Sequence, residues 1–476
     1  MIPRGPQAGG VPASLRREAE GTRTIIPRSA RSAIGRVLLA AAAVALIAGR
    51  ARPASAQENL SLADAVRIAS GGAASVEIAK ANEAGARARR SQARGVLLPS
   101  FSGSASDFNR TVSLKAQGFS FPSGPGFPSF PDPLGPFETF DARLRASQTL
   151  FDLSGYRHLH AADLGTSQAT ADRNASSEAA AQQAATTYLR AARAAALLAA
   201  RQADERIAGD LLSLAEAQQQ AGTAPRIDRT RARTALAAAR GQTLVARNQL
   251  DRALLDLARA LGHAPDQKLA LTDTLGGEMA RSDAPEVQGT ATGVAFERRP
   301  ELASQRAREA SARAERSAIS SERLPKIDAQ ADWGLSGQNA AHAVDTREYG
   351  VALTMPFLDG GRREARLAEQ SSVIEATTIR TRDLRDQIAA EVQAALLDLS
   401  SGREQLAVAD EQLGLAQEQL DEARERFTSG VAGNIEVINA QASLQGARDT
   451  EIEARFAIAA ARVALARATG VARTLR

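Results

Sequence analysis

Residues 357–476 constrain the fold of this chain most, because the stretch contains no proline and carries a long heptad pattern. Large apolar residues recur every seven positions: Val392, Leu399, Leu406, Leu413, Leu420 and Phe427. Small residues follow three positions after the first five: Ala395, Gly402, Ala409, Ala416 and Ala423. Such stripes are typical of a helix that supercoils closely against its neighbours. The pattern breaks at residues 430–434 and then resumes, which predicts a helical hairpin with one arm of roughly 70 residues, or about 100 Å.

The same unit occurs twice along the chain. Matching residues are Leu98-Pro99 and Leu324-Pro325, Gly222 and Gly430, and Gly262 and Gly470. Both glycine pairs are 208 positions apart, whereas the region between the Leu-Pro pair and the long helix is 19 residues longer in the first copy. We expect one repeat at 57–262, a linker at 263–287 and a second repeat at 288–476, with helical tips near 222–228 and 430–436.

Four segments have the period of two that is typical of strands with one apolar and one polar side, at about 99–110, 138–151, 326–336 and 348–358. Strands of about this length fit a tilted bilayer crossing, in which the apolar side faces lipid and the polar side an aqueous lumen. The residues that we expect to face the membrane are Phe140, Leu144, Leu150, Trp333, Leu335, Tyr349, Val351 and Leu353.

Phenylalanine is concentrated around the first predicted strand pair, with nine of the 13 residues between positions 101 and 151. Several lie in a loop rich in Gly, Pro and Ser at 118–136. An aromatic girdle or a loop at the membrane surface explains this placement, and a small hydrophobic cluster within the loop is the alternative. Four strands cannot close a barrel whose edges must be paired in lipid. Several copies of the chain must therefore share one barrel.

The N-terminus predicts export of the protein. Arginines precede an apolar run at 37–48, and Ala54 and Ala56 provide small residues for cleavage before Gln57. We interpret residues 1–56 as a secretory signal peptide with an unusually early start, and a buried N-terminal helix is the alternative. This segment holds nine arginines and two acidic residues, so the net charge of +5 becomes about −2 without it. Nucleic acid is therefore not an expected partner.

The residue types that carry chemistry are scarce. The chain has no cysteine, which excludes disulfides, thiolate metal sites and an N-terminal lipid anchor through Cys. The four histidines have no metal-ligand spacing such as H-E-x-x-H, and no glycine-rich phosphate loop follows a strand. We expect no catalytic residues, no metal and no cofactor, and hence no enzyme.

The order of these features resembles the TolC family of outer-membrane efflux proteins over residues 60 to 470, roughly. The resemblance is carried by the doubled units, by Leu-Pro before the first strand of each, by Leu358-Asp359-Gly360-Gly361-Arg362 and by Ile435-Glu436-Val437-Ile438-Asn439-Ala440-Gln441 after Gly430. It implies a mainly α-helical chain with a small membrane β part. Three subunits would form a homotrimer, each giving four strands to a 12-stranded barrel and its helices to a periplasmic α-barrel.

The resemblance also implies the setting in which the protein works. The trimer would lie in the outer membrane of a Gram-negative bacterium, in contact with lipid, with its helices in the periplasm. It would be the passive exit duct of a tripartite efflux pump or a type I secretion system, docked at its tips to a periplasmic adaptor and energised by an inner-membrane transporter. The cargo could be a drug, a metal ion or a polypeptide.

In the family, rings of carboxylates and polar bonds between the turns close the periplasmic end. The residues of this chain that match that region are Glu436, Asn439, Asp228, Gly222, Gly430 and Phe427. Glu436 keeps one carboxylate ring, and Asn439 replaces the other by an amide. Phe427 and Ala432 stand where the family has a latch hydroxyl and an arginine, and neither can make those bonds. Three converging Glu436 carboxylates would repel one another or attract cations.

Two simpler interpretations of the tip charges stay open. Glu436 could be a solvated charge on a helix face. We interpret the arginines at 226, 229, 231 and 233 as a solvated face in preference to an adaptor contact. As alternatives for the whole protein we keep a periplasmic adaptor and a structural coiled-coil protein of the cell envelope. The two hairpins argue against the first, because adaptors normally carry one, and the alternating strands argue against the second.

Overall fold

The computed structural model describes residues 58–119, 131–276 and 279–476. The predicted signal peptide, with Ala54, Ala56 and Gln57, lies outside these residues, and so does most of the phenylalanine-rich loop. Residues 57–476 form one compact unit. None of the helices within the described ranges is both long and apolar enough to span a membrane.

The first repeat contains α2 (Leu62–Gly72), α3 (Ala74–Gly95), α4 (Leu153–Gln220) and α5 (Arg226–Leu261). Ser61 is the N-cap of α2, where its Oγ accepts a hydrogen bond from the backbone N–H of Asp64 at 3.1 Å. Gly262 ends α5 with a φ of 75°, in the left-handed region that glycine adopts without strain.

The second repeat contains α6 (Gln288–Arg298), α7 (Pro300–Ser321), α8 (Arg362–Thr428) and α9 (Asn434–Ala468). Pro300 occupies the first turn of α7, where its missing N–H costs no helical hydrogen bond. Helices α4 and α8 have 68 and 67 residues, close to the roughly 70 expected from the heptads.

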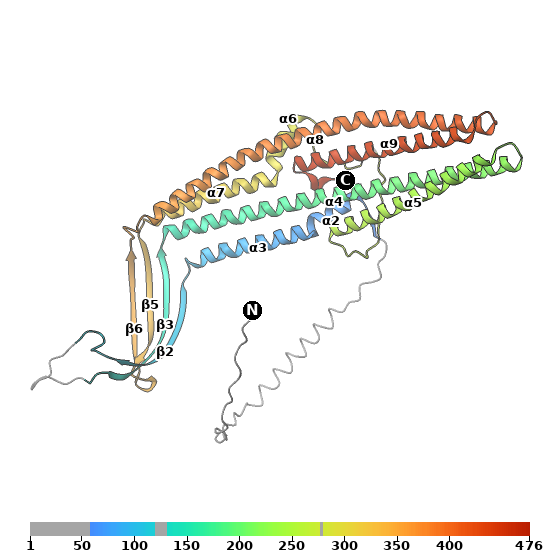
Figure 1. The fold of residues 1–476 in the computed structure, drawn as a ribbon. Coiled ribbons are helices and arrows are strands. Elements are labelled where there is room, and N and C mark those ends of the chain that lie inside the picture. The colour runs from blue at the N-terminus through green and yellow to red at the C-terminus, as the bar shows by residue number, and fades with distance from the viewer. Residues whose placement is uncertain (1–57, 120–130, 277–278) are drawn as a thin grey trace, which may run out of the picture. The chain divides into compact units, whose positions relative to one another are not determined.

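Four long helix segments lie side by side in the order α8, α9, α4, α5 (Figure 1). The large heptad residues Val392, Leu399, Leu420 and Phe427 are buried, and so is the whole small stripe. A Cβ at Gly402 would lie 3.1 Å from Ile458 Cγ1. The small stripe therefore allows α8 and α9 to approach closely. Nearer the sheet, α3 and α7 pack on α4, and α7 also packs on α8.

The sheet contains β2 (Ser100–Val112), β3 (Leu134–Phe151), β5 (Lys326–Gly337) and β6 (Val344–Thr354), in the order β2-β3-β5-β6 with every pair antiparallel. β6 differs from the predicted range of 348–358. It begins at Val344, which pairs with Ser336, and it ends before Pro356, which has no N–H for a ladder. Met355 and Phe357 thus lie outside the strand although they continue its alternation.

The segment predicted as a linker is packed against the core. Its strand β4 (Leu269–Leu271) pairs in parallel with β1 (Glu58–Leu60). Leu269, Leu275 and Met279 are buried in the same cluster as Tyr188. The Tyr188 hydroxyl donates to the Leu60 carbonyl at 2.9 Å. Three-residue strands are too short to show a periodicity, which is why the sequence did not predict them.

Candidate functional site

The two helical tips are formed by matching turns, at 221–225 between α4 and α5 and at 429–433 between α8 and α9. Gly222 and Gly430 have φ values of 76° and 71°. A side chain at either position would strain the backbone, so glycine is required for the turn.

A buried amide joins the two tips. Asn434, the first residue of α9, is fully buried, and its Nδ2 donates to the carbonyl oxygen of Asp228 on α5 at 2.7 Å. Gln218 Nε2, at the end of α4, donates to the carbonyl oxygen of Phe427 at 3.3 Å. Neither amide is among the residues predicted from the sequence. For Asn434 the one hint in the sequence is its place directly after the turn of the second repeat, where the first repeat has Arg226. The sequence around Gln218 offers no such hint.

The predicted tip residues divide into two groups. Phe427 is buried among Leu420, Leu444 and other apolar residues of α4, α5, α8 and α9, so it holds the tip by packing. Asp228 is also buried, with a carboxylate oxygen 3.6 Å from Arg231 Nη1. The structure therefore places these two inside the bundle.

Glu436 and Asn439 are accessible. They lie three positions apart on α9, so they share one face of the helix. Glu436 Oε2 lies 3.5 Å from Arg426 Nη1 at the end of α8. This partner, which was not predicted, offsets part of the negative charge at the tip. Because both groups are more than a third exposed, the pair contributes little stability.

A cluster of charges lies between the hairpins, where α4 contacts α9. Asp204 and Arg201 are buried. Asp204 lies 2.8 Å from Arg448 and 3.2 Å from Arg201, and Arg201 also lies 2.6 Å from Asp449. Gln441 Nε2 donates to the backbone carbonyl of Asp204 at 3.0 Å. The cluster fixes the lateral position and the register of α9 on α4.

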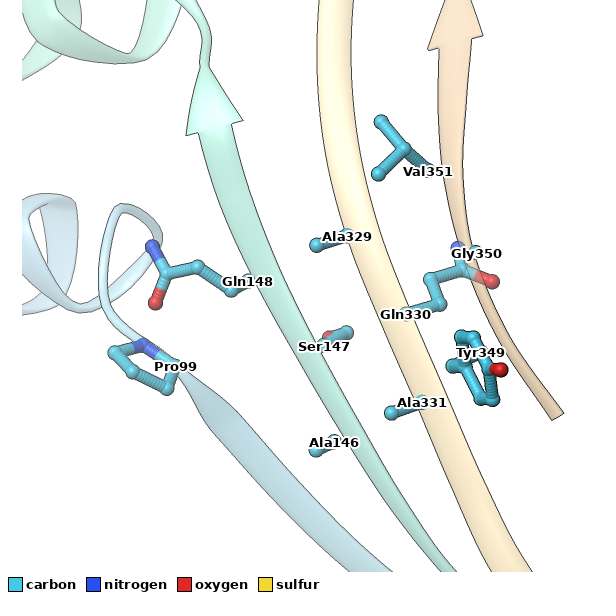
Figure 2. Close-up of a pocket in the computed structure, with 10 residues that line it drawn as sticks. All are labelled: Pro99, Ala146, Ser147, Gln148, Ala329, Gln330, Ala331, Tyr349, Gly350 and Val351. Carbon is cyan, nitrogen blue, oxygen red and sulfur yellow. The ribbon is translucent and has the colours of Figure 1, made fainter. Parts of the chain in front are cut away.

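One face of the sheet is apolar, and the register brings most of the predicted membrane residues onto it. Directly paired residues share a face. Phe140, Leu144, Trp333, Leu335, Tyr349, Val351 and Leu353 all fall on this face. Leu150 lies at the register shift between Thr149 and Phe151 and has no direct partner. A shallow hollow of about 390 Å³ lies here, with Ala146, Ala329 and Ala331 between Pro99 and Tyr349 (Figure 2).

The opposite face is polar. Arg143 Nε donates to Asp141 at 2.8 Å, and Arg143 Nη1 donates to Asp332 on the neighbouring strand at 2.9 Å. Ser100 and Ser147 are hydrogen-bonded across β2 and β3 at 2.7 Å. The sheet thus has one side suited to an apolar medium and one side suited to water.

A histidine connects the helices near the sheet. His158 Nδ1 on α4 lies 3.1 Å from Glu315 on α7, and its Nε2 lies 3.7 Å from Glu322. The hydrogen bond to Glu315 raises the pKa of His158 above its ordinary value, against the opposing effect of burial. Within the described ranges no three His, Asp or Glu side chains are grouped as metal ligands.

Comparisons with known proteins agree with this architecture. A protein-family model described as outer membrane efflux protein matches residues 65–263 and 292–471, one segment in each repeat. The pyoverdine export outer membrane protein OpmQ of Pseudomonas putida is 27% identical over 339 residues, which is 70% of each chain.

Solved outer-membrane channels have the same fold at low sequence identity. The CmeC channel of Campylobacter jejuni has a TM-score of 0.73 and 17% identity, with 86% of each chain covered. VceC of Vibrio cholerae has a TM-score of 0.71 and 18% identity, with 86% of this chain and 96% of VceC covered. MtrE of Neisseria gonorrhoeae has a TM-score of 0.70 and 18% identity, with 86% and 89% covered.

Proposed function

Since this chain belongs to the outer membrane efflux protein family, we propose that three copies of it form the exit duct of a tripartite export system. Members of this family are channels, and the chain is an outer-membrane efflux channel with a TolC-like fold. The predicted family, the mainly helical fold with a small sheet and the outer-membrane location are thereby confirmed. The alternatives of an adaptor and of a structural coiled coil are wrong, because both repeats match the channel family.

The trimer is supported by the edges of the sheet. β2 and β6 are the edge strands of the four-stranded sheet. Unpaired edges are too costly in lipid, so β6 of one copy should pair with β2 of the next. Three copies then close a barrel of 12 strands. The polar face with Arg143 and Asp332 would line an aqueous lumen, and the apolar face with Leu144 and Trp333 would contact lipid.

The tips are the proposed site of docking and gating. Asp228 and Phe427 would hold the turns together from inside the bundle, and Gly222 and Gly430 would shape them. Glu436 and Asn439 would form an accessible polar ring at the periplasmic end. A periplasmic adaptor would dock at these tips, and an inner-membrane transporter would supply the energy. Chemistry by the duct itself is not required.

The similarity to OpmQ supports export of a small molecule in preference to a polypeptide, because that relative is a pyoverdine export protein. Deletion of the gene should therefore sensitise cells to toxic compounds or reduce export of a metabolite, and leave the set of secreted proteins unchanged. The protein should run on gels as a heat-modifiable trimer from outer membranes. No sensitivity, no export defect and no trimer would together refute the duct.

The ring is tested by Glu436→Ala in planar bilayers, with measurement of conductance and of block by divalent cations. We expect block to weaken, because three carboxylates are lost at one level of the pore. The matched control is Glu375→Ala, which removes an exposed carboxylate from the half of α8 nearer the sheet. Unchanged block in Glu436→Ala would remove this residue from the gate.

A further inference from the structure

The layer of long helices has two outer edges, α5 and α8, because α9 and α4 lie between them (Figure 1). If the proposed trimer forms, α5 of one copy is the neighbour of α8 in the next. The inference below rests on that trimer and identifies the residues on which its helical seam depends.

Each edge carries a stripe of charges with heptad spacing, and the two stripes have opposite sign. On α5 the exposed residues are Arg226, Arg233, Arg240 and Arg247. On α8 they are Glu404, Glu411, Glu418 and Glu425. Residues seven apart on a supercoiled helix lie along one line. In the described part of the chain none of the four glutamates has an ion-pair partner, and of the arginines only Arg240 has one, Glu205 at 3.6 Å.

The contact between α4 and α9 inside one chain provides a template for the contact between copies. By the 208-residue repeat, α4 corresponds to α8 and α9 to α5. The residues of α9 that match the four arginines are Asn434, Gln441, Arg448 and Arg455. Arg455 pairs with Glu451 of its own helix. The other three contact the first hairpin: Asn434 at the Asp228 carbonyl, Gln441 at the Asp204 carbonyl and Arg448 at the Asp204 carboxylate.

The template also sets the register. Arg448 lies opposite Asp204 in the antiparallel pair. The residues that correspond to them by the 208-residue repeat are Arg240 and Gln412, so in a matching contact Arg240 would lie opposite Gln412 and beside Glu411. Arg233 matches Gln441, which also contacts Asp204. In an antiparallel pair Arg233, one heptad nearer the tip than Arg240, would lie near Glu418, one heptad nearer the tip than Glu411.

Apolar residues beside the charges follow the same correspondence. Ile452 on α9 and Ala200 on α4 belong to one core cluster. Their counterparts are Leu244 on α5 and Val408 on α8, which are 67% and 54% exposed in the single chain. Ile452 is buried at the α4–α9 seam and Ala200 is partly buried there, whereas the larger Leu244 and Val408 are exposed at the outer edges of the single chain. This difference indicates that the second seam is completed by another copy.

We propose that α5 and α8 of neighbouring copies form an antiparallel seam, in which Leu244 packs on Val408 and the arginine stripe pairs with the glutamate stripe, Arg240 facing Glu411. The partner at both edges is a second copy of this chain. The seam is heterologous, since each copy offers its basic edge to the acidic edge of the next, and such contacts close into a ring when the rotation between copies is that of the proposed trimer.

The absence of cysteine from the chain makes a crosslinking test clean. Full-length protein with Leu244→Cys and Val408→Cys, purified from outer membranes, is treated with a short bis-maleimide and run on a denaturing gel after heating. We expect covalent dimers and trimers. The matched control pairs Leu244→Cys with Leu397→Cys. Leu397 is an exposed leucine on α8 and lies about 16 Å from Val408 along the helix axis at 1.5 Å per residue. The first pair should crosslink at least tenfold more than the control.

A charge reversal tests the polar part of the seam. Arg240→Glu should lower the temperature at which the trimer dissociates by several degrees, and adding Glu411→Arg should restore it. Arg252→Glu makes the same charge change at an exposed position of α5 outside the stripe and should have no effect. Rescue by the second change separates the seam from the contact of Arg240 with Glu205 in its own chain.

The outcomes distinguish failure of the proposed seam from failure of the proposed duct function. If the unmodified protein is an outer-membrane trimer and the Leu244–Val408 pair crosslinks no more than the control, the seam is wrong and the duct stands. Failure of the double charge variant to recover, in a protein that still assembles, would likewise overturn the Arg240–Glu411 pairing. Absence of the trimer from outer membranes refutes the proposed function itself.

Discussion

Replacing Asp204 by asparagine should loosen the contact between α4 and α9. Asp204 is 1% exposed, and its carboxylate lies between Arg448 and Arg201. The asparagine keeps the size of the side chain and one acceptor oxygen but removes the charge. Arg201 retains Asp449 as a partner, whereas Arg448 has no second ion pair in the described part of the chain.

The magnitude follows from these surroundings. Removing one partner of a fully buried ion pair costs about 3–5 kcal/mol. The cost here should be lower, because the Arg448 side chain is 22% exposed and can reach water. A hydrogen bond to a charged group contributes about 1.5–3 kcal/mol, and we expect a loss in that range. At about 1.4 kcal/mol for each factor of ten, local opening should become roughly 10- to 100-fold more frequent.

Hydrogen exchange followed by mass spectrometry on the solubilised protein measures this directly. Protection should fall by that factor in peptides covering 200–211 and 438–452, and stay unchanged in β5. Glu453→Gln is the control, because it breaks a pair with Arg193 whose side chains are both exposed. A surface pair is worth about 1 kcal/mol at most, or about fivefold. Equal effects of the two substitutions would refute the argument that burial makes the Asp204 cluster important.

Three further perturbations test other parts of the molecule. Because hydrogen bonding to Glu315 raises the pKa of His158, the stability it adds is fully present below the unfolded pKa of about 6.5 and is lost as pH rises through the raised value. The thermal midpoint of His158→Gln should therefore fall further below wild type at about pH 5.5 than at about pH 9, and equal gaps would contradict this. Phe427→Ala should cost about 3–5 kcal/mol by leaving a cavity at the tip; limited trypsin digestion should then cut near residues 424–433, and an unchanged digestion pattern would count against it. Leu353→Arg, on the apolar face of the sheet, should cost about 2–4 kcal/mol if that face meets lipid. Gln330→Arg on the polar face should be tolerated, and equal yields of assembled trimer would show that the two faces are not distinguished.

The long helices could be predicted because their signals are local. The spacing of Val392, Leu399 and Leu420 predicts the buried side of α8, and Gly430 predicts its turn, without knowledge of any other element. The strand alternation is equally local, and the register places Leu144, Trp333 and most other predicted membrane residues on one face. The end of β6 depends on Pro356, because proline has no N–H for the strand ladder even though apolar and polar residues continue to alternate past it.

Contacts between the hairpins could not be predicted, because they depend on how the two repeats lie side by side. Asn434 and Gln218 are ordinary polar helix residues in the sequence, and only the fold places each against a carbonyl of the other hairpin. The same holds for Arg201 and Asp204, which look like solvated charges until α9 covers them. Glu436 and Asn439 stay predictions as gate residues, since their role depends on three copies around one axis.

The α4–α9 contact also bears on how such a protein is made. A newly exported chain can complete this contact by itself, since both helices and the charges between them belong to one polypeptide. The product would have a basic border on one side and an acidic border on the other. Two such monomers meeting by like borders would repel each other, so two-fold dimers would be disfavoured during biogenesis. In the proposed ring, growth would then proceed in one rotational sense and stop when the last border meets the first.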